Sequence, residues 1–259
     1  MGNYYFLTSL FSPLEIGHPP AMHSEELTDI LREDLNTDDW ITFCSMRQYL
    51  DLENLRNWLK GDPVDPRGNF TAKELEENIE NETGLPDFVF EFLKTYEELD
   101  ERLRFFPSLF TRFFDEVLTE EDDFLNHYFT FEREWRLVTV GFRAKLLDRD
   151  LSKELQYEDP TDTIVAQILA QKDSPSFEPP YGYENLKAVF ETHRAEPFKL
   201  HKAFCEYRFD KILEMENNAL FSMDRILGHM ARLLIVEQWM ELDEQEGNKV
   251  IDLIGSEET

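Results

Sequence analysis

The sequence predicts an all-α fold, a bundle of long helices, because three kinds of observation agree. Apolar residues recur at helical spacing along most of the chain. Ser, Thr and Asp stand where these stretches begin, and Gly or Pro stands where they end. The stretch from Phe221 to Ile254 combines a cap at Ser222 with a centre, Leu233 to Val236, that is apolar on every side. Such a centre needs other helices around it.

The first half of the chain is expected to form helices separated by turns rich in Pro and Gly. Residues 3–13 fit either a short helix or an extended arm. Thr71 and Glu74 have the spacing of a capping box, Ser24 is a candidate N-cap, and Pro107 is expected to interrupt the helix that carries the phenylalanines. The expected helices are 24–35, 37–59, 71–83, 87–103 and 108–117.

The second half is expected to continue the same pattern. Thr119 and Asp122 would cap a helix in which Val138-Thr139-Val140, although β-prone, keeps the helical period of its flanks. Gly247 is expected to end the last long helix before a short docking helix. Helices are expected at 123–155, 163–171, 184–195, 198–215, 221–246 and 250–254. The four prolines within 157–184 suggest an insertion or hinge in a single all-helical domain, residues 1–259.

Charge is the outstanding feature of the composition. The 26 Lys and Arg residues against 55 Asp and Glu give a net charge of -29, while 41% hydrophobic residues and 22 Phe predict a folded core. This acidity disfavours nucleic acid and anionic membrane surfaces as direct partners. It favours a basic protein partner, unless the acidity serves solubility alone.

Metal and catalytic motifs are weak or missing in the sequence. The DLNTDD segment from Asp34 begins like a calcium loop but has Asp39 where Gly is needed. His201 and Cys205 lie one helical turn apart, yet two ligands do not make a metal site, and a core Cys beside a half-exposed His is the simpler interpretation. No Gly-rich phosphate loop, GxSxG elbow or HExxH motif occurs. We therefore expect no catalytic, cofactor-binding or metal-binding residue, no small-molecule substrate, and no enzyme.

Cysteine use and hydropathy bear on location. Cys44 and Cys205 lie far apart and fit a reducing compartment. The first residues lack the features of a signal peptide, and no run of 18 apolar residues occurs. We expect a cytoplasmic protein without direct membrane insertion, held at the inner face of the membrane only through a membrane complex.

Three tryptophans hint at an internal repeat. Trp58, Trp135 and Trp239 each follow an apolar helical stretch with charged residues nearby, at uneven spacing. Three degenerate helical repeats would account for this pattern, and chance similarity between helices is the alternative.

Both ends of the chain resemble a known family. Tyr4 to Leu7 followed by Pro13, and the LLIVEQWMELDEQEG segment from Leu233 to Gly247, resemble an uncharacterised family encoded among the subunits of bacterial V-type ATPases. That family is similar in position to the C-type subunit, called d in eukaryotes, an all-helical funnel of three repeats. Features similar to its repeats are Glu53-Asn54-Leu55-Arg56, Glu132 to Arg136 and Ile235 to Trp239. The last departs from the pattern, with Glu237-Gln238-Trp239 where Asn-Leu-Arg would be expected, and the chain is shorter than is typical of the C-type subunit.

The resemblance implies a non-catalytic subunit of a bacterial V-type ATPase. Such a subunit would couple the central rotor stalk to the membrane ring in proton or sodium transport, with stalk and ring subunits as its partners. The alternative is an acidic helical adaptor or assembly factor that acts on the same or another complex without joining it. Copy number in the purified complex would distinguish the two.

Overall fold

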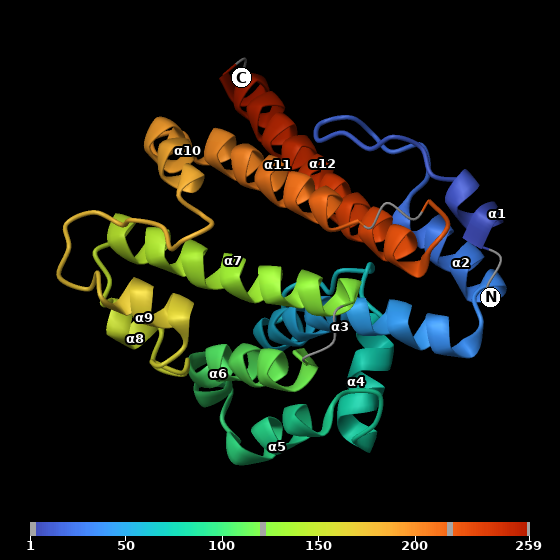
Figure 1. Ribbon diagram of the computed structural model, residues 1–259, viewed down its shortest axis with the longest axis horizontal. Helices are drawn as coiled ribbons and strands as arrows, with labels where there is room; N and C mark the ends of the chain where they lie inside the picture. The colour runs from blue at the N-terminus through green and yellow to red at the C-terminus, as the bar shows by residue number, and fades with distance from the viewer. Residues whose placement is uncertain (1–3, 120–122, 217–219, 258–259) are drawn as a thin grey trace. The chain divides into compact units, whose positions relative to one another are not determined.

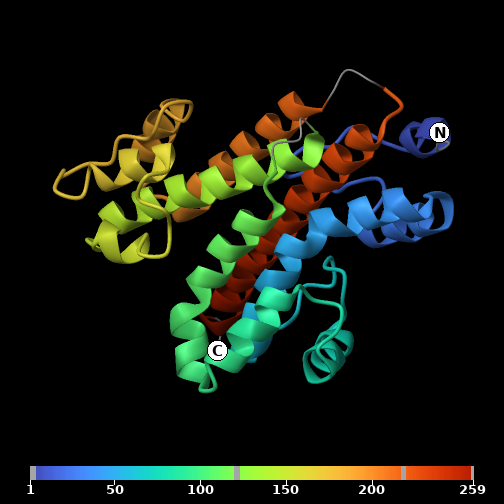
Figure 2. The same cartoon turned by 60° about the horizontal axis from the view of Figure 1, so that its bottom comes forward.

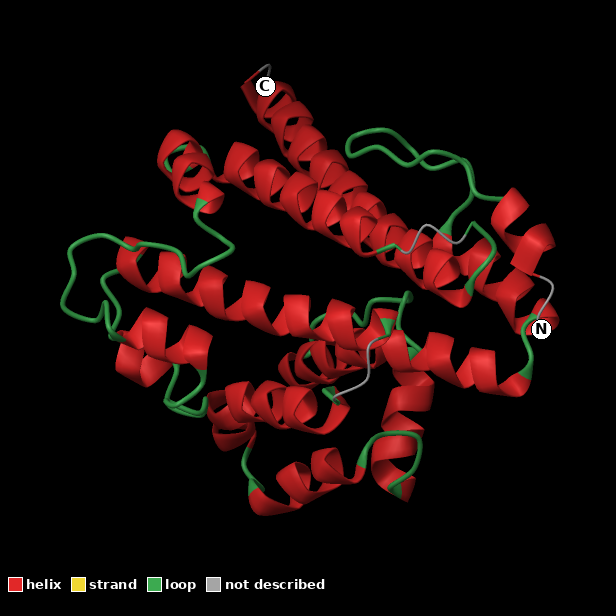
Figure 3. Ribbon diagram, in the orientation of Figure 1, coloured by secondary structure: helices red, strands yellow, loops and turns green. Residues whose placement is uncertain are grey.

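The computed structural model is all-helical, as the periodicity predicts (Figure 1). It describes residues 4–119, 123–216 and 220–257, with side chains described as far as Leu242. Twelve helices and no strand occur in these ranges (Figure 3). Their bounds are α1 Tyr4–Ser9, α2 Ser24–Asp34, α3 Thr37–Lys60, α4 Ala72–Asn81, α5 Asp87–Thr95, α6 Leu99–Val117, α7 Phe124–Leu146, α8 Leu151–Glu154, α9 Thr163–Leu169, α10 Asn185–His193, α11 Pro197–Met215 and α12 Met223–Glu257.

The chain divides into two compact units. Unit 1 comprises residues 1–43 and 193–259, and unit 2 comprises residues 44–192. Both boundaries fall outside the Pro-rich stretch 157–184, which lies wholly within unit 2. The expectations of one domain, of a hinge in that stretch and of three repeats stay predictions.

Unit 1 is built around the pairing of α11 with α12, which lie side by side in Figures 1 and 2. Leu233, Ile235 and Val236 are at most 3% exposed, which confirms that the middle of α12 is enclosed. The Oγ of Ser222 accepts the backbone N–H of Arg225 and caps the helix as expected. At the α11 end, the Glu216 carboxylate pairs with Arg225 and with the buried guanidinium of Arg232.

Unit 2 has an aromatic core contributed by α3, α5, α6 and α7. Phe106, Phe113 and Phe114 are at most 1% exposed, and Tyr49 of α3 lies 5.4 to 6.0 Å from the rings of three α6 phenylalanines. These phenylalanines therefore belong to the folded core that the composition predicts. The Pro-rich stretch is fastened to this unit by Phe177, whose ring lies so close to Gly141 of α7 that a Cβ there would meet it at 2.2 Å.

A polar stripe on α3 holds the loop that follows it. The Asn54 amide bonds both the N–H and the carbonyl of Asp65, while Asp51 accepts the N–H and the side-chain amide of Asn69. Arg47 donates to the carbonyl of Gly68. Arg47, Asp51 and Asn54 are each at most 5% exposed, so the loop backbone replaces water as their hydrogen-bonding partner.

Burial gives Asp51 an unusual pH dependence. Despite its bonds to Asn69, loss of hydration raises the pKa of Asp51 to about 6. The folded state therefore holds this proton more tightly than the unfolded state, and the contribution of Asp51 to stability falls as pH rises from its ordinary pKa of 3.8 to about 6. Between pH 4 and pH 7 we expect the wild type to lose roughly 2 kcal/mol relative to Asp51→Asn. Urea unfolding of both proteins at several pH values measures this, and parallel stability curves would contradict it.

Several helix limits follow the sequence signals closely. The capping box of Thr71 and Glu74 is present, α3 begins at Thr37, and Val138 to Val140 lies inside α7. The N-terminal segment resolves into a short helix, α1, followed by a loop.

Other limits differ from the expectation. Pro107 lies inside α6, and the break comes at Tyr96 to Glu98, where Arg102 donates to the carbonyls of Leu93 and Tyr96 at the end of α5. Burial of the α6 phenylalanines outweighs the roughly 3 kcal/mol that an interior Pro costs a helix.

The long helix expected from 123 to 155 ends at Leu146 instead. Asp148 adopts a left-handed conformation, with φ of 51°, and the N–H of Arg149 returns to the carbonyl of Ala144. This is a Schellman motif without the usual glycine. The cap of α7 is Asp123, whose carboxylate accepts the N–H of Asn126, while Asp122 lies outside the described residues.

The break expected at Gly247 is wrong, because α12 continues to Glu257.

Candidate functional site

His201 and Cys205 come together as their spacing predicts, but they do not form a reactive pair. The Sγ of Cys205 lies 3.6 Å from Nε2 of His201, and the imidazole stacks on Trp239. Burial raises the pKa of the Cys205 thiol and lowers the pKa of His201. Both shifts favour the neutral forms, whereas a nucleophilic thiolate beside an imidazolium requires the opposite shifts.

The calcium-loop candidate has a structural explanation. Oδ1 of Asn36 accepts the N–H groups of Asp38 and Asp39, so the DLNTDD segment caps the N-terminus of α3. Across the described part of the chain, no group of three or more His, Cys, Asp or Glu side chains is arranged to hold a metal ion.

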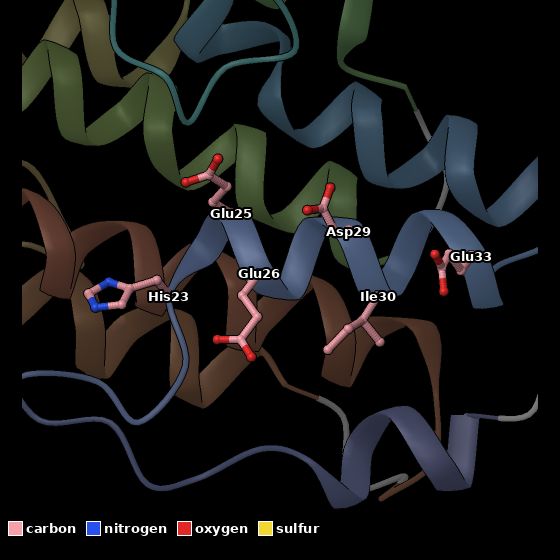
Figure 4. A pocket seen from close by; sticks show the side chains of 6 residues that line it. All are labelled: His23, Glu25, Glu26, Asp29, Ile30 and Glu33. Atoms are coloured by element: carbon pink, nitrogen blue, oxygen red, sulfur yellow. The ribbon is translucent and has the colours of Figure 1, made fainter.

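Unit 1 carries a hollow of about 550 Å³ along α2. Figure 4 shows its lining, which consists of His23, Glu25, Glu26, Asp29, Ile30 and Glu33. The four carboxylates point outward from successive turns of one helix, and all four residues are exposed. We call Glu25, Glu26, Asp29 and Glu33 the α2 acidic face.

The sequence of α2 explains why these carboxylates face outward. Leu27 and Leu31 are fully buried, and Ser24 is 5% exposed. These three residues recur at a spacing of three or four and fix one side of the helix against unit 1, so that the acids occupy the other side. Glu25 and Glu26 also lie in the first turn, where the helix dipole favours negative charge.

A buried carboxylate of α12 anchors the start of α2. Oε1 of Glu237 accepts the Ser24 N–H at 2.8 Å and lies 3.0 Å from Nδ1 of His23, while Oε2 accepts the Ser24 hydroxyl at 2.5 Å. Ser24 is therefore the first residue of α2 and not its cap, because the capping oxygen comes from a residue more than 200 positions away. Glu237 is 8% exposed and Ser24 is 5% exposed, so the two bonds between them are shielded from water, whereas the His23 side chain is exposed.

The end of α2 is held by aromatic contacts and by α1. The Arg32 guanidinium lies 5.3 Å from the centre of the Trp40 ring. The phenol of Tyr4 donates to Oδ2 of Asp39 at 2.8 Å, and burial together with this carboxylate raises the pKa of Tyr4 to about 12. The phenol thus stays protonated at neutral pH, and the bond places α1 beside the α2–α3 turn, as Figures 1 and 2 both show.

The segment that carries the α2 acidic face has far more acidic than basic residues. Residues 24–39 carry seven carboxylates and one basic residue, Arg32. In unit 2, by contrast, the buried Glu158 pairs with Arg133 and Arg136, and Lys94 pairs with Glu82. No Lys or Arg among the described residues forms a salt bridge with Glu25, Glu26, Asp29 or Glu33. Their negative potential is thus available to an external cation or to a basic polypeptide.

Sequence reasoning foresaw an acidic surface but not its position. The signal lay in residues 24–39, where acids outnumber bases far more than in the whole chain. The role of Glu237 had no local signal, because its partners lie at the other end of the sequence. It is also the first of three residues, Glu237-Gln238-Trp239, at which the sequence departs from the Asn-Leu-Arg that the resemblance to the C-type subunit would imply.

No helix in the described ranges combines the length and the apolar character that a bilayer span requires.

Comparison with known proteins places the chain in a family. The chain is 31% identical to an uncharacterized protein of Chlamydia muridarum and 30% identical to one of Chlamydia trachomatis serovar D, over 260 residues and 98% of each chain in both cases. An uncharacterized protein of Chlamydia pneumoniae is 29% identical over 98% of both chains. No solved structure matches the chain at a significant level. A family model described as "Protein of unknown function (DUF2764)" matches residues 1–258, and the chain therefore belongs to the DUF2764 family.

Proposed function

We propose that this protein is a non-catalytic, protein-binding subunit of a bacterial V-type ATPase. In this role, like the C-type subunit, it couples the central rotor stalk to the membrane ring during proton or sodium transport. The observation that carries the binding role is the α2 acidic face, a row of exposed carboxylates on an anchored helix that form no salt bridge with any Lys or Arg of the described residues. The assignment to a V-type ATPase rests on the resemblance of Tyr4 to Pro13, of Leu233 to Gly247 and of Glu53 to Arg56.

The architecture suits a coupling role physically. A coupling protein has to transmit force between other polypeptides, and long paired helices such as α11 and α12 provide a stiff body. Buried polar groups of the long helices, Asn54 and Glu237, hold distant backbone segments in place. The neutral protonation states favoured at His201 and Cys205 also support binding in preference to catalysis.

Electrostatic complementarity identifies the kind of partner. Exposed carboxylates attract basic ends of stalk helices or basic cytoplasmic loops of the ring, and they increase the rate of encounter more than the final affinity. The protein would then lie at the inner face of the membrane through the complex, without inserting itself.

The test is purification of the tagged protein from cells that encode a V-type ATPase. We expect ATPase stalk and ring subunits to co-purify at low salt, with one copy of this protein per ATP-hydrolysing complex, and the binding to weaken as salt rises. Quantitative mass spectrometry gives the copy number. A protein that is lost from the mature complex would instead be an assembly factor, and absence of ATPase subunits at every salt concentration would contradict the proposal.

A further inference from the structure

Unit 1 also exposes large apolar side chains on α1, the helix that the Tyr4–Asp39 hydrogen bond places beside the α2–α3 turn, and in the turn before α12. Tyr5 is 67% exposed, Phe6 47%, Leu220 68% and Phe221 52%. The rings of Tyr5 and Phe221 contact each other, with centroids 5.0 Å apart, so that α1 and the turn before α12 contribute to one patch. We call Tyr5, Phe6, Leu220 and Phe221 the apolar patch.

The apolar patch is fixed in place by its neighbours. Leu7 of α1 is 1% exposed and anchors this short helix in the core of unit 1. Tyr4, next to Tyr5, is bonded to Asp39 at the beginning of α3. The bonding of the α1 polar groups therefore leaves the adjacent aromatic rings on the outside, although large apolar side chains of a globular domain are normally covered when they cluster.

We propose that the apolar patch is the docking site of a basic amphipathic helix from a partner polypeptide. The apolar side of that helix would cover Tyr5 and Phe221, and its Lys and Arg side chains would reach the α2 acidic face. This inference rests on the proposed function, since it specifies how a partner polypeptide would be recognised.

Charge selects this occupant over the other possibilities. A second copy of this chain carries the same net charge of -29 and the same α2 acidic face, so like charges would approach each other. An anionic membrane surface is repelled for the same reason. A helix that is apolar on one side and basic on the other complements both the apolar patch and the α2 acidic face. Amphipathic helices commonly bind proteins in this way, with the apolar side against a hydrophobic surface.

The test uses a synthetic helical peptide with Leu on one face and Lys on the other, labelled for fluorescence anisotropy. Its control has the same composition in an order that destroys the apolar face.

The patch variant is Tyr5→Ser with Phe221→Ser, and its matched control is Leu146→Ser with Leu147→Ser, two exposed residues of unit 2. The charge variant is Glu25→Gln, Glu26→Gln, Asp29→Asn and Glu33→Gln. Its matched control is Glu97→Gln, Glu98→Gln, Asp100→Asn and Glu101→Gln, which removes four exposed acids around the start of α6.

We expect the patch variant and the charge variant each to weaken binding roughly tenfold at low salt, and the two control variants to change it less than about twofold. High salt should reduce the effect of the charge variant and preserve that of the patch variant. Equal losses in variants and controls would overturn the proposal, because they would indicate attraction to overall charge. Self-association that depends on Phe221, or sedimentation with anionic vesicles, would overturn it as well. If the patch variant fails to fold, the charge variant alone decides.

The same variants distinguish this inference from the proposed function. If the wild type binds the V-type ATPase and the patch and charge variants bind it equally well, docking at this patch is wrong and the proposed function stands. If the variants lose the peptide while the wild type binds no ATPase component, the docking site stands and the proposed function is wrong.

Discussion

Replacing Glu237 with alanine is expected to lower the free energy of unfolding by roughly 3 kcal/mol or more. The substitution removes the acceptor of the Ser24 N–H and of the Ser24 hydroxyl, both of which are buried. A hydrogen bond to a charged group contributes roughly 1.5 to 3 kcal/mol, and a buried donor that loses its partner costs its desolvation as well. Urea unfolding followed by circular dichroism measures the change.

Two further variants show whether the effect arises from the anchoring of α2. Glu237→Gln keeps one oxygen that can accept the Ser24 N–H, so its cost should be smaller, roughly 1 kcal/mol. Glu206→Ala removes an exposed carboxylate of α11 and should stay within about 0.5 kcal/mol of the wild type. The alanine variant should also bind the Lys/Leu peptide more weakly, because α2 would no longer be held in place. Equal stability of Glu237→Ala and Glu206→Ala would refute the anchoring role.

Acid sensitivity is expected to be concentrated at His229. This imidazole is 6% exposed and stacks on Phe11 with ring centroids 4.0 Å apart. Burial, together with the positive charges of Arg232 and Arg225, lowers the pKa of His229 to about 3. The native state therefore keeps the ring neutral, whereas the unfolded chain takes up a proton below its ordinary pKa of 6.5. Stability from this residue is lost as pH falls from about 6.5 to about 3.

Replacing His229 with phenylalanine tests this expectation. The variant keeps a flat ring for the stack on Phe11 and removes the proton-binding site. Relative to the wild type, we expect it to gain roughly 3 kcal/mol of unfolding free energy between pH 7 and pH 4. His18→Gln, at an exposed histidine in the same unit, should show no such gain. A constant difference between His229→Phe and wild type across this pH range would show that the histidine does not control acid stability.

The helices that the sequence predicts well are those whose ends are set by capping residues in the same turn. Thr71 and Glu74 are three residues apart, and Ser222 stands directly before α12. Asn36 directly precedes Thr37, the first residue of α3, and accepts a backbone N–H of its first turn. In each case the group that satisfies the first backbone N–H groups belongs to the same turn, so periodicity and capping rules suffice.

Other helix ends were not predicted from the sequence. Some depend on a side chain from outside the local turn, and one depends on a residue other than glycine in the left-handed conformation. Arg102 ends α5 by bonding two of its carbonyls, and Asp148 ends α7 in a conformation usually taken by glycine. Pro107 is tolerated because the aromatic core of unit 2 outweighs its cost.

The acidic character of the candidate site could be predicted from the sequence, but its position in the fold could not. Composition indicates an acidic surface that favours a basic partner, and the cluster of acids around α2 is visible once sought. That Glu237 anchors this helix, and that the rings of Tyr5 and Phe221 meet, depends on contacts between the two ends of the chain. Such contacts across more than 200 residues cannot be derived from periodicity or spacing.

Carbodiimide cross-linking tests most directly whether the α2 acidic face meets the partner. The reagent joins a carboxylate to a lysine amine only when the two groups are close enough to form a salt bridge, and mass spectrometry identifies the peptides that are joined. With the V-type ATPase complex or the Lys/Leu peptide as partner, we predict cross-links at Glu25, Glu26, Asp29 and Glu33. Cross-links confined to acids of unit 2, such as Glu97 to Glu101, with none on α2, would contradict the account.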